Sequence, residues 1–242
     1  MVIFFVGLNL IDYAIVALFA LSVLVGLHRG TVATGLNLLA LGLSLVIAKL
    51  CYPLAAEWIA GHETWMNYLV YFSEGSSHIP TAMMEYARAD ITTLTAEQVQ
   101  QVIRANFSAP FDEYLASNIA GQVYAGQYFT LFDYFNQTVA DVSLNTLSFL
   151  LVFAFAYLVS TLLVRLIDDT FCFPLLKACD SLVGGALGLL RGYVLMMLLA
   201  TMVPLVLNML QIQLIHDLVD GSAFLKHFYP GNWFFGWIRS IL

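Results

Sequence analysis

Between Asp141 and Arg165 the sequence reads VSLNTLSFLLVFAFAYLVSTLLV, residues 142–164, without one charged side chain. An α-helix rises roughly 1.5 Å per residue, so about 20 such residues cross the ~30 Å hydrocarbon core of a bilayer. Lipid offers no hydrogen-bond partner to the backbone, and a single apolar segment of this length can satisfy its own amides only as a helix. The stretch therefore predicts a transmembrane helix and an all-α integral membrane protein.

The composition of the chain agrees with this fold class. Of its 242 residues, 61 % are hydrophobic and only 10 % are charged, whereas about a quarter of an average soluble chain is charged. A water-soluble globule of this composition would expose large apolar patches, which excludes a soluble enzyme and a disordered chain. The formal net charge of −7 also argues against nucleic acid as a partner. The expected partner is the lipid bilayer.

Three further segments are long and apolar enough to cross a bilayer, which gives four predicted spans. His28–Gly30 separates the first two spans and predicts a tight antiparallel hairpin. Arg191 is the only charge between Ser181 and Ile215, and placing it at the start of the fourth span avoids burying a guanidinium, which costs at least ~2.5 kcal/mol. This favours a separate interfacial or re-entrant helix at 181–190; the alternative is one tilted helix with Arg191 near mid-membrane. The three added spans are Leu8–Leu27, Thr31–Leu50 and Gly192–Leu210.

The predicted spans divide the chain into four parts. An acidic segment between the second and third spans holds nine carboxylates against Arg88 and Arg104. Thr95–Gln98 resembles a capping box before a periodic apolar helix, and Ser108–Phe111 resembles a second helix start. The parts are a transmembrane hairpin at 1–61, an acidic extramembrane helical insertion at 62–141, a second transmembrane pair at 142–210 with a glycine-rich segment at 180–192, and an interfacial aromatic tail at 211–242.

Basic residues near the span ends predict the orientation, because lysine and arginine are retained on the cytoplasmic side. Arg29, Arg165 and Lys177 lie in the two short loops, and Arg191 joins them if it begins the fourth span. Both termini and the insertion are then expected outside.

Two similar pentapeptides occur at Gly26–Gly30 and Gly188–Gly192. In the second region Asp180, Gly184 and Gly188 recur every four residues, and Arg191 returns to within about 20° of the same helical face. Small residues at this spacing let helix backbones approach closely. We expect a polar contact between the first span and this stripe, or the same stripe in a second subunit, with Asp12, an acid within the first span, as the candidate partner. In the alternative, Asp12 lies at the outer interface and Arg191 at the inner one, too far apart to touch.

No catalytic or metal-binding pattern is present in the sequence. H-E-x-x-H, G-x-S-x-G and Walker A motifs are missing, and the acidic insertion lacks the spacing of an EF-hand. We therefore expect neither an enzyme nor a cofactor or metal site.

Three motifs together resemble the bacterial colicin V production protein family (CvpA): N-x-x-D at Asn9–Asp12, G-x-x-R-G at Gly26–Gly30, and D-x-x-x-G-x-x-x-G-x-x-R-G at Asp180–Gly192. The likeness covers about Asn9–Glu57 and Val142–Leu210. It implies a four-span protein of the bacterial inner membrane connected with colicin V production or export. The positions that match are Asp12, Arg29, Gly30, Asp180, Gly184, Gly188, Arg191 and Gly192.

These features favour a non-catalytic membrane factor that supports toxin production, secretion or cell-envelope processes through contacts with a membrane-protein partner or a second copy of the chain. The alternative function is an oligomeric transporter or channel for a small solute.

Overall fold

The computed structural model describes residues 8–72, 79–106, 112, 115–116, 119, 130–170, 177–203, 206–207, 213–228, 232, 234 and 237. The chain forms two compact units. Unit 1 comprises Met1–Trp58, Asn145–Met202 and Gln213–Leu242, and unit 2 comprises Ile59–Leu144 and Val203–Ile212.

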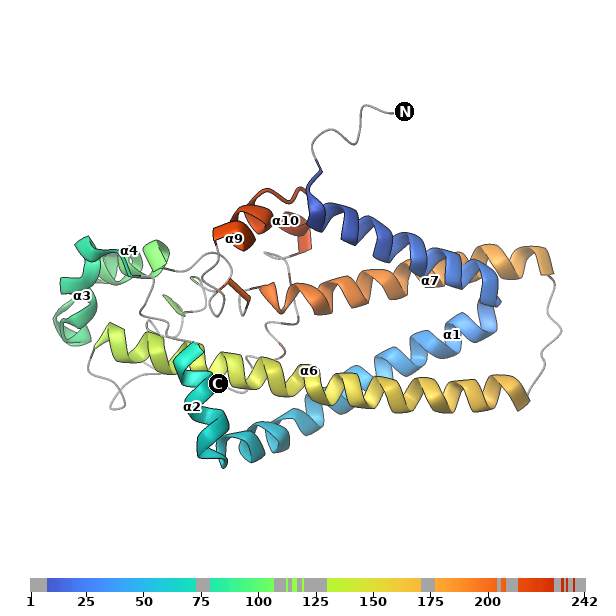
Figure 1. Cartoon of the computed structure of the whole chain (residues 1–242), viewed down its shortest axis with the longest axis horizontal. Helices are drawn as coiled ribbons and strands as arrows, with labels where there is room; N and C mark the ends of the chain where they lie inside the picture. The colour runs from blue at the N-terminus through green and yellow to red at the C-terminus, as the bar shows by residue number, and fades with distance from the viewer. Residues whose placement is uncertain are drawn as a thin grey trace. The chain divides into compact units, whose positions relative to one another are not determined.

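Unit 1 begins with α1, Leu10–Ala60, which is broken at Gly30 by a backbone with φ 78° and ψ −178°. A residue with a Cβ is strained at this positive φ, whereas glycine adopts it freely. Figure 1 shows α1 turning back on itself, so the turn predicted at His28–Gly30 is present. We call residues 10–29 the first arm and residues 31–60 the second arm.

Unit 1 also contains α6, Leu131–Thr170, from Asn145 onward, and α7, Lys177–Ala200. Ser44 Oγ donates to Ser160 Oγ at 3.2 Å, and the rings of Tyr52 and Phe149 meet edge to face at 6.1 Å. The second arm and α6 therefore run antiparallel. Leu41, Leu45, Ala48, Phe153, Met197, Leu198 and Phe234 complete the buried cluster that joins these helices.

The predicted break at Arg191 is wrong. α7 runs without interruption through Arg191 and ends at Ala200, so 181–190 is no separate helix and the helix does not extend from Gly192 to Leu210. Turn hydrogen bonds from the Thr201 and Met202 amides to Leu198 and Leu199 carbonyls follow.

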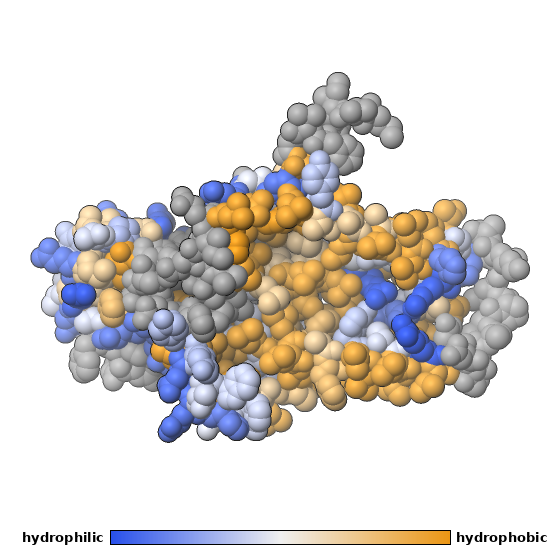
Figure 2. All heavy atoms as spheres, viewed as in Figure 1, coloured by the Kyte–Doolittle hydropathy of each residue, from blue (hydrophilic) through white to orange (hydrophobic). Residues whose placement is uncertain are grey.

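The outward faces of the long helices are apolar. Leu39, Phe155 and Leu182 are each 70 % exposed or more, and Figure 2 shows hydrophobic side chains covering much of the surface over α1, α6 and α7. Exposing such a large apolar surface to water would be energetically unfavourable, whereas contact with lipid tails would not. Within the described residues, three helices are long and apolar enough to cross a membrane: Leu10–Ala60, Leu131–Leu166 and Asp180–Ala200.

Unit 2 is made of short helices around its own core. Thr95 and Gln98 form the predicted capping box: the Thr95 amide donates to Gln98 Oε1 at 2.9 Å, and the Gln98 amide to Thr95 Oγ1 at 3.3 Å. The second predicted helix start, at 108–111, lies outside the described residues. The elements are α2 Glu63–Phe72, a 3-10 turn at Thr81–Met83, α3 Met84–Arg88, a second 3-10 turn at Ile91–Thr93 and α4 Ala96–Asn106. The core includes Ile79, Ala87, Ile91, Val99, Val102, Ile103, Leu115 and Phe135.

α6 starts eleven residues before the predicted third span, and Thr130 caps its N-terminus. Thr130 Oγ1 accepts from the Asp133 amide at 3.1 Å and donates to Asp133 Oδ2 at 2.8 Å. The third span was predicted from its uncharged stretch alone, so this T-x-x-D pattern did not enter the prediction.

Asp90 in unit 2 supplies a pH-dependent contribution to stability. Hydrogen bonds from the Thr92 hydroxyl and amide hold the pKa of Asp90 below its ordinary value. A carboxyl whose pKa is lower in the folded state stabilises the fold above its unfolded pKa of about 3.9, and this contribution disappears as pH falls through the folded value. We expect Asp90→Asn to lower the melting temperature of the full chain at pH 6 and to have no effect at a pH below the folded value. An equal loss at both pH values would contradict this.

The C-terminal segment packs into unit 1. α9 Gln213–Asp220 and α10 Leu225–Phe228 follow α7, and the Phe228 ring lies 6.1 Å from Phe19 and 5.7 Å from Tyr193. Phe234 is fully buried, and Asn232 Nδ2 donates to the Met197 carbonyl at 2.8 Å. The described part of the tail thus packs among the helices of unit 1. The sequence predicted instead an aromatic anchor lying in the membrane interface.

Candidate functional site

The first arm and α7 cross at a set of small residues that we call the glycine seam: Ser22, Gly26 and Gly30 from α1, and Gly184 and Gly188 from α7. A Cβ on Gly184 would collide with the Gly26 carbonyl oxygen and lie 2.8 Å from Gly30 C, and a Cβ on Gly188 would collide with the Ser22 carbonyl oxygen. Real Cβ atoms essentially never lie within 3.0 Å of another group. The two similar pentapeptides therefore touch at Gly26 and Gly188, while Gly30 lies against Asp180 and Gly184, and Gly192 lies against Ser22. The first arm and α7 are antiparallel here.

One end of the seam is closed by polar side chains from the start of α7. Asp180 Oδ1 accepts from the Thr31 amide at 2.7 Å, and Thr31 Oγ1 donates to the Asp180 carbonyl at 2.9 Å. Ser181 Oγ donates to the Leu27 carbonyl at 2.8 Å. The break at Gly30 leaves unpaired amides at the start of the second arm and unpaired carbonyls at the end of the first. α7 thus caps both arms, and the Asp180 carboxylate lies at the positive end of the second arm's dipole.

Gly192 and Arg29 hold different positions relative to the seam. A Cβ on Gly192 would lie 3.0 Å from Ser22 Cβ and 3.4 Å from the Phe19 ring, so this glycine extends the seam with a looser fit. The Arg29 side chain is exposed beside the bend. Arg29 therefore forms no part of the packed contact.

Arg191 contacts α6 rather than the first arm. Its Nη2 donates to the Tyr157 hydroxyl, with the guanidinium carbon 5.9 Å from the centre of that ring. Tyr157 in turn stacks on Phe153 with ring centres 5.6 Å apart. Arg191 is half-buried inside the apolar segment Asp180–Ala200.

Asp12 is fully buried and binds the C-terminal segment. Its carboxylate accepts from Ser222 Oγ at 2.6 Å, the Phe224 amide at 3.0 Å and the Ala223 amide at 3.2 Å. It also accepts from the Asn9 amide at 3.1 Å, while Asn9 Oδ1 accepts from the Asp12 amide at 3.1 Å. This pair is a reciprocal capping box at the start of α1. Asp12 thereby ties the turn after α9 to the beginning of the first arm.

Within one chain, the expected contact of Asp12 with the stripe that ends in Arg191 is wrong. Each group has other partners: Asp12 bonds to Ser222 and neighbouring amides, and Arg191 bonds to Tyr157. Asp180, Gly184 and Gly188 do pack against the first arm, but at its bend and not at Asp12.

These separate partners lead to a prediction about coupling. We expect the losses in unfolding free energy caused by Asp12→Ala and Arg191→Ala to add in the double variant, within about 0.5 kcal/mol, because the two sites share no partner. Unfolding of the purified chain in mixed micelles would measure all four proteins. If the double variant is hardly less stable than either single variant, the result would instead support a direct pair between Asp12 and Arg191.

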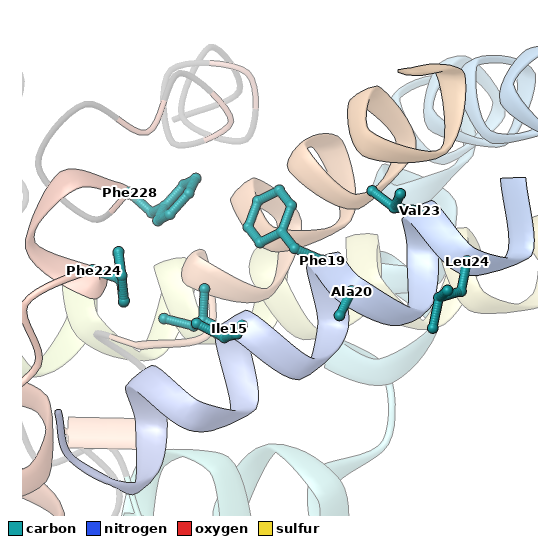
Figure 3. A pocket seen from close by; sticks show the side chains of 8 residues that line it. Ile15, Phe19, Ala20, Val23, Leu24, Phe224 and Phe228 are labelled. Atoms are coloured by element: carbon teal, nitrogen blue, oxygen red, sulfur yellow. The ribbon is translucent and has the colours of Figure 1, made fainter. Parts of the chain in front are cut away.

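An apolar groove lies between the first arm and the segment around α10 (Figure 3). Its volume is about 570 Å³, and its lining residues are Ile15, Val16, Phe19, Ala20, Val23, Leu24, Phe224 and Phe228. These side chains bring no catalytic group. Among the described residues, no three His, Cys, Asp or Glu side chains are placed to hold a metal ion together.

The long apolar helices, their lipid-type outer surface and the small-residue seam define a multi-pass α-helical membrane protein. The sequence profile of the colicin V production protein family matches residues 11–85 and 91–230. The chain belongs to that family, which confirms the resemblance carried by the three motifs. The match also extends beyond Asn9–Glu57 and Val142–Leu210, the segments that carried the resemblance. It includes most of 62–141 and part of the tail. No curated protein and no solved structure matches the chain.

Five residues that the structure places at these contacts were not predicted from the sequence: Thr31, Ser181, Tyr157, Ser222 and Asn232. Thr31 and Ser181 follow the helix break and Asp180 directly, so their capping chemistry was available locally. Tyr157 and Ser222 carried no signal, because their partners lie 34 and 210 residues away in the chain.

Proposed function

We propose that this protein is a non-catalytic factor of the bacterial inner membrane that supports colicin V-type toxin production, secretion or cell-envelope processes through contacts with another protein. Membership of the colicin V production protein family supports the proposed role in toxin production. The proposed contact with another protein rests on unit 2, because this is a compact helical unit with its own core. The glycine seam is occupied within the chain, so it is not the proposed contact surface.

The surface of unit 2 indicates what kind of partner it would bind. Residues 62–141 carry nine carboxylates against two arginines, and the side chains of Glu63, Glu85, Asp90, Glu97 and Asp133 are exposed. A partner with a basic surface would be attracted to this charge, with an association rate that falls as salt is raised.

Site-specific photo-crosslinking tests the proposed contact. A photoreactive residue at Gln100 or Gln101, both exposed on α4, should crosslink in cells to one protein of defined mass. The matched control is the same residue at Phe155, exposed on the apolar face of α6, which should give lipid adducts. Loss of crosslinking after neutralising Glu97 would support binding of the partner to the acidic surface. Crosslinks to protein from position 155 alone would contradict that contact.

We infer four membrane crossings, formed by the two arms of α1, by α6 and by α7. The bend at Gly30, the end of α6 and the start of α7 lie at one end of unit 1 (Figure 1), and Arg29, Arg165 and Lys177 belong to this end. The positive-inside rule then puts that end in the cytoplasm and both termini outside.

Cysteine labelling tests the orientation. In a background without Cys51, Cys172 and Cys179, a cysteine at Glu97 should react with an impermeant reagent in intact cells. A cysteine at Asp169 should react only after permeabilisation. The reverse pattern would place unit 2 in the cytoplasm and invert the topology.

The second candidate function is an oligomeric pathway for a small solute. Arg191 within an apolar helix favours it, because charged residues at such positions commonly line solute pathways. Flux measured in liposomes over a panel of solutes tests this candidate. Equal flux through the wild type and Arg191→Ala would remove Arg191 from any pathway.

A further inference from the structure

Arg191 has a hydrogen-bonding donor that the described chain leaves unused. Its Nη2 donates to Tyr157, but Nε is buried and has no hydrogen-bond partner. Among the described residues, no carboxylate forms an ion pair with it. The residue lies eleven positions after Asp180, about 16 Å along α7, within the apolar segment Asp180–Ala200. Within the part of the chain that the structure describes, Arg191 is thus a half-buried cation without a counter-charge.

The neighbouring tyrosine adds a second donor at the same place. The Tyr157 hydroxyl accepts the hydrogen bond from Arg191, so its own proton stays available for a further acceptor. Stacking on Phe153, with ring planes only 10° apart, fixes the tyrosine ring. The pair therefore presents one positive charge and two donors, and it lacks the acceptor that would satisfy them.

We propose that Arg191 and Tyr157 form a binding site for a monovalent inorganic anion such as chloride or nitrate. The anion supplies the missing negative charge and accepts from Nε–H and from the tyrosine hydroxyl. A single charge suits this place, because the cost of removing an ion from water rises steeply with its charge in apolar surroundings. The site goes beyond both candidate functions, since it requires neither a protein partner nor solute flux.

Binding can be measured on the purified full-length protein in nanodiscs of phosphatidylcholine. Chloride is the probe, and broadening of its NMR signal reports binding. The wild type should show saturable broadening that nitrate displaces. Arg191→Gln should abolish it, and Tyr157→Phe should weaken the affinity about tenfold by removing one hydrogen bond to a charged group. Arg29→Gln removes the same charge from an exposed position and should bind as the wild type does.

Several results would overturn the site. These are absence of saturable broadening in the wild type, equal broadening in Arg191→Gln, and wild-type affinity in Tyr157→Phe. The last variant keeps the test decisive even if Arg191→Gln does not fold. Loss of chloride binding when phosphatidylglycerol replaces phosphatidylcholine would also overturn it, because a lipid with a net negative headgroup would then be the anion that the pair binds.

Discussion

Gly188→Leu is expected to destabilise the protein by about 3 kcal/mol or more, above the usual range for overpacking. A Cβ at this position would meet the Ser22 carbonyl oxygen and lie 3.1 Å from its carbon and 3.3 Å from Gly26 Cα. These are backbone atoms, so the first arm as a whole must move away from α7. Unfolding of the purified chain, followed by tryptophan fluorescence as SDS is added to mild-detergent micelles, measures the effect.

Two other glycines serve as matched controls. A Cβ on Gly42 would meet no neighbouring group within 4 Å, so Gly42→Leu should stay within about 0.5 kcal/mol of the wild type, as at ordinary surface sites. A Cβ on Gly185 would lie 2.7 Å from the end of the Leu27 side chain, which can rotate aside, so Gly185→Leu should be intermediate. A loss at Gly42 as large as that at Gly188 would show that the seam is not the packed contact described above.

Asp12→Ala is expected to free the C-terminal segment from the first arm. The change leaves the Ser222 hydroxyl and the Ala223 and Phe224 amides without their buried acceptor. Since hydrogen bonds to a charged group contribute roughly 1.5–3 kcal/mol each, we expect a total loss of about 3 kcal/mol or more. Hydrogen exchange of the Ala223 and Phe224 amides in the full chain should accelerate about a hundredfold.

Two variants make this result specific. Ser222→Ala removes one of the donors to Asp12 and should accelerate the same amides less. Asp133→Ala removes the carboxylate that accepts from the Thr130 hydroxyl at the start of α6 and should leave residues 223 and 224 unaffected. Unchanged exchange at these two amides in Asp12→Ala would mean that Asp12 does not hold the segment, which then depends on its other contacts, such as Phe228 with Phe19 and Tyr193.

Local patterns in the sequence were sufficient to predict several features of the helices. The uncharged stretch at 142–164 lies within α6, Gly30 breaks α1 where the two apolar runs meet, and Thr95–Gln98 begins α4. The spacing of Asp180, Gly184 and Gly188 also placed these residues on one face of α7. Each feature depends on hydropathy, backbone freedom or capping within a few residues, so neighbouring residues decide it.

Arg191 shows where such reasoning failed. The cost of burying a guanidinium favoured a helix break at this residue, but α7 continues through it, and Tyr157 from α6 accepts a hydrogen bond from the guanidinium. The tail was judged by composition alone, whereas Phe234 is buried against the long helices. In both cases the deciding group comes from a distant part of the chain.

The sequence by itself determined that this is a helical membrane protein of the colicin V production family, with a glycine stripe ending in an arginine. Only the tertiary structure decided the partner of each polar group: Thr31 for Asp180, Ser222 for Asp12 and Tyr157 for Arg191. Helix formation depends on interactions within one turn, which the order of residues specifies directly. The pairing of buried polar groups depends on which helix faces become neighbours, and that is fixed only when the whole bundle packs.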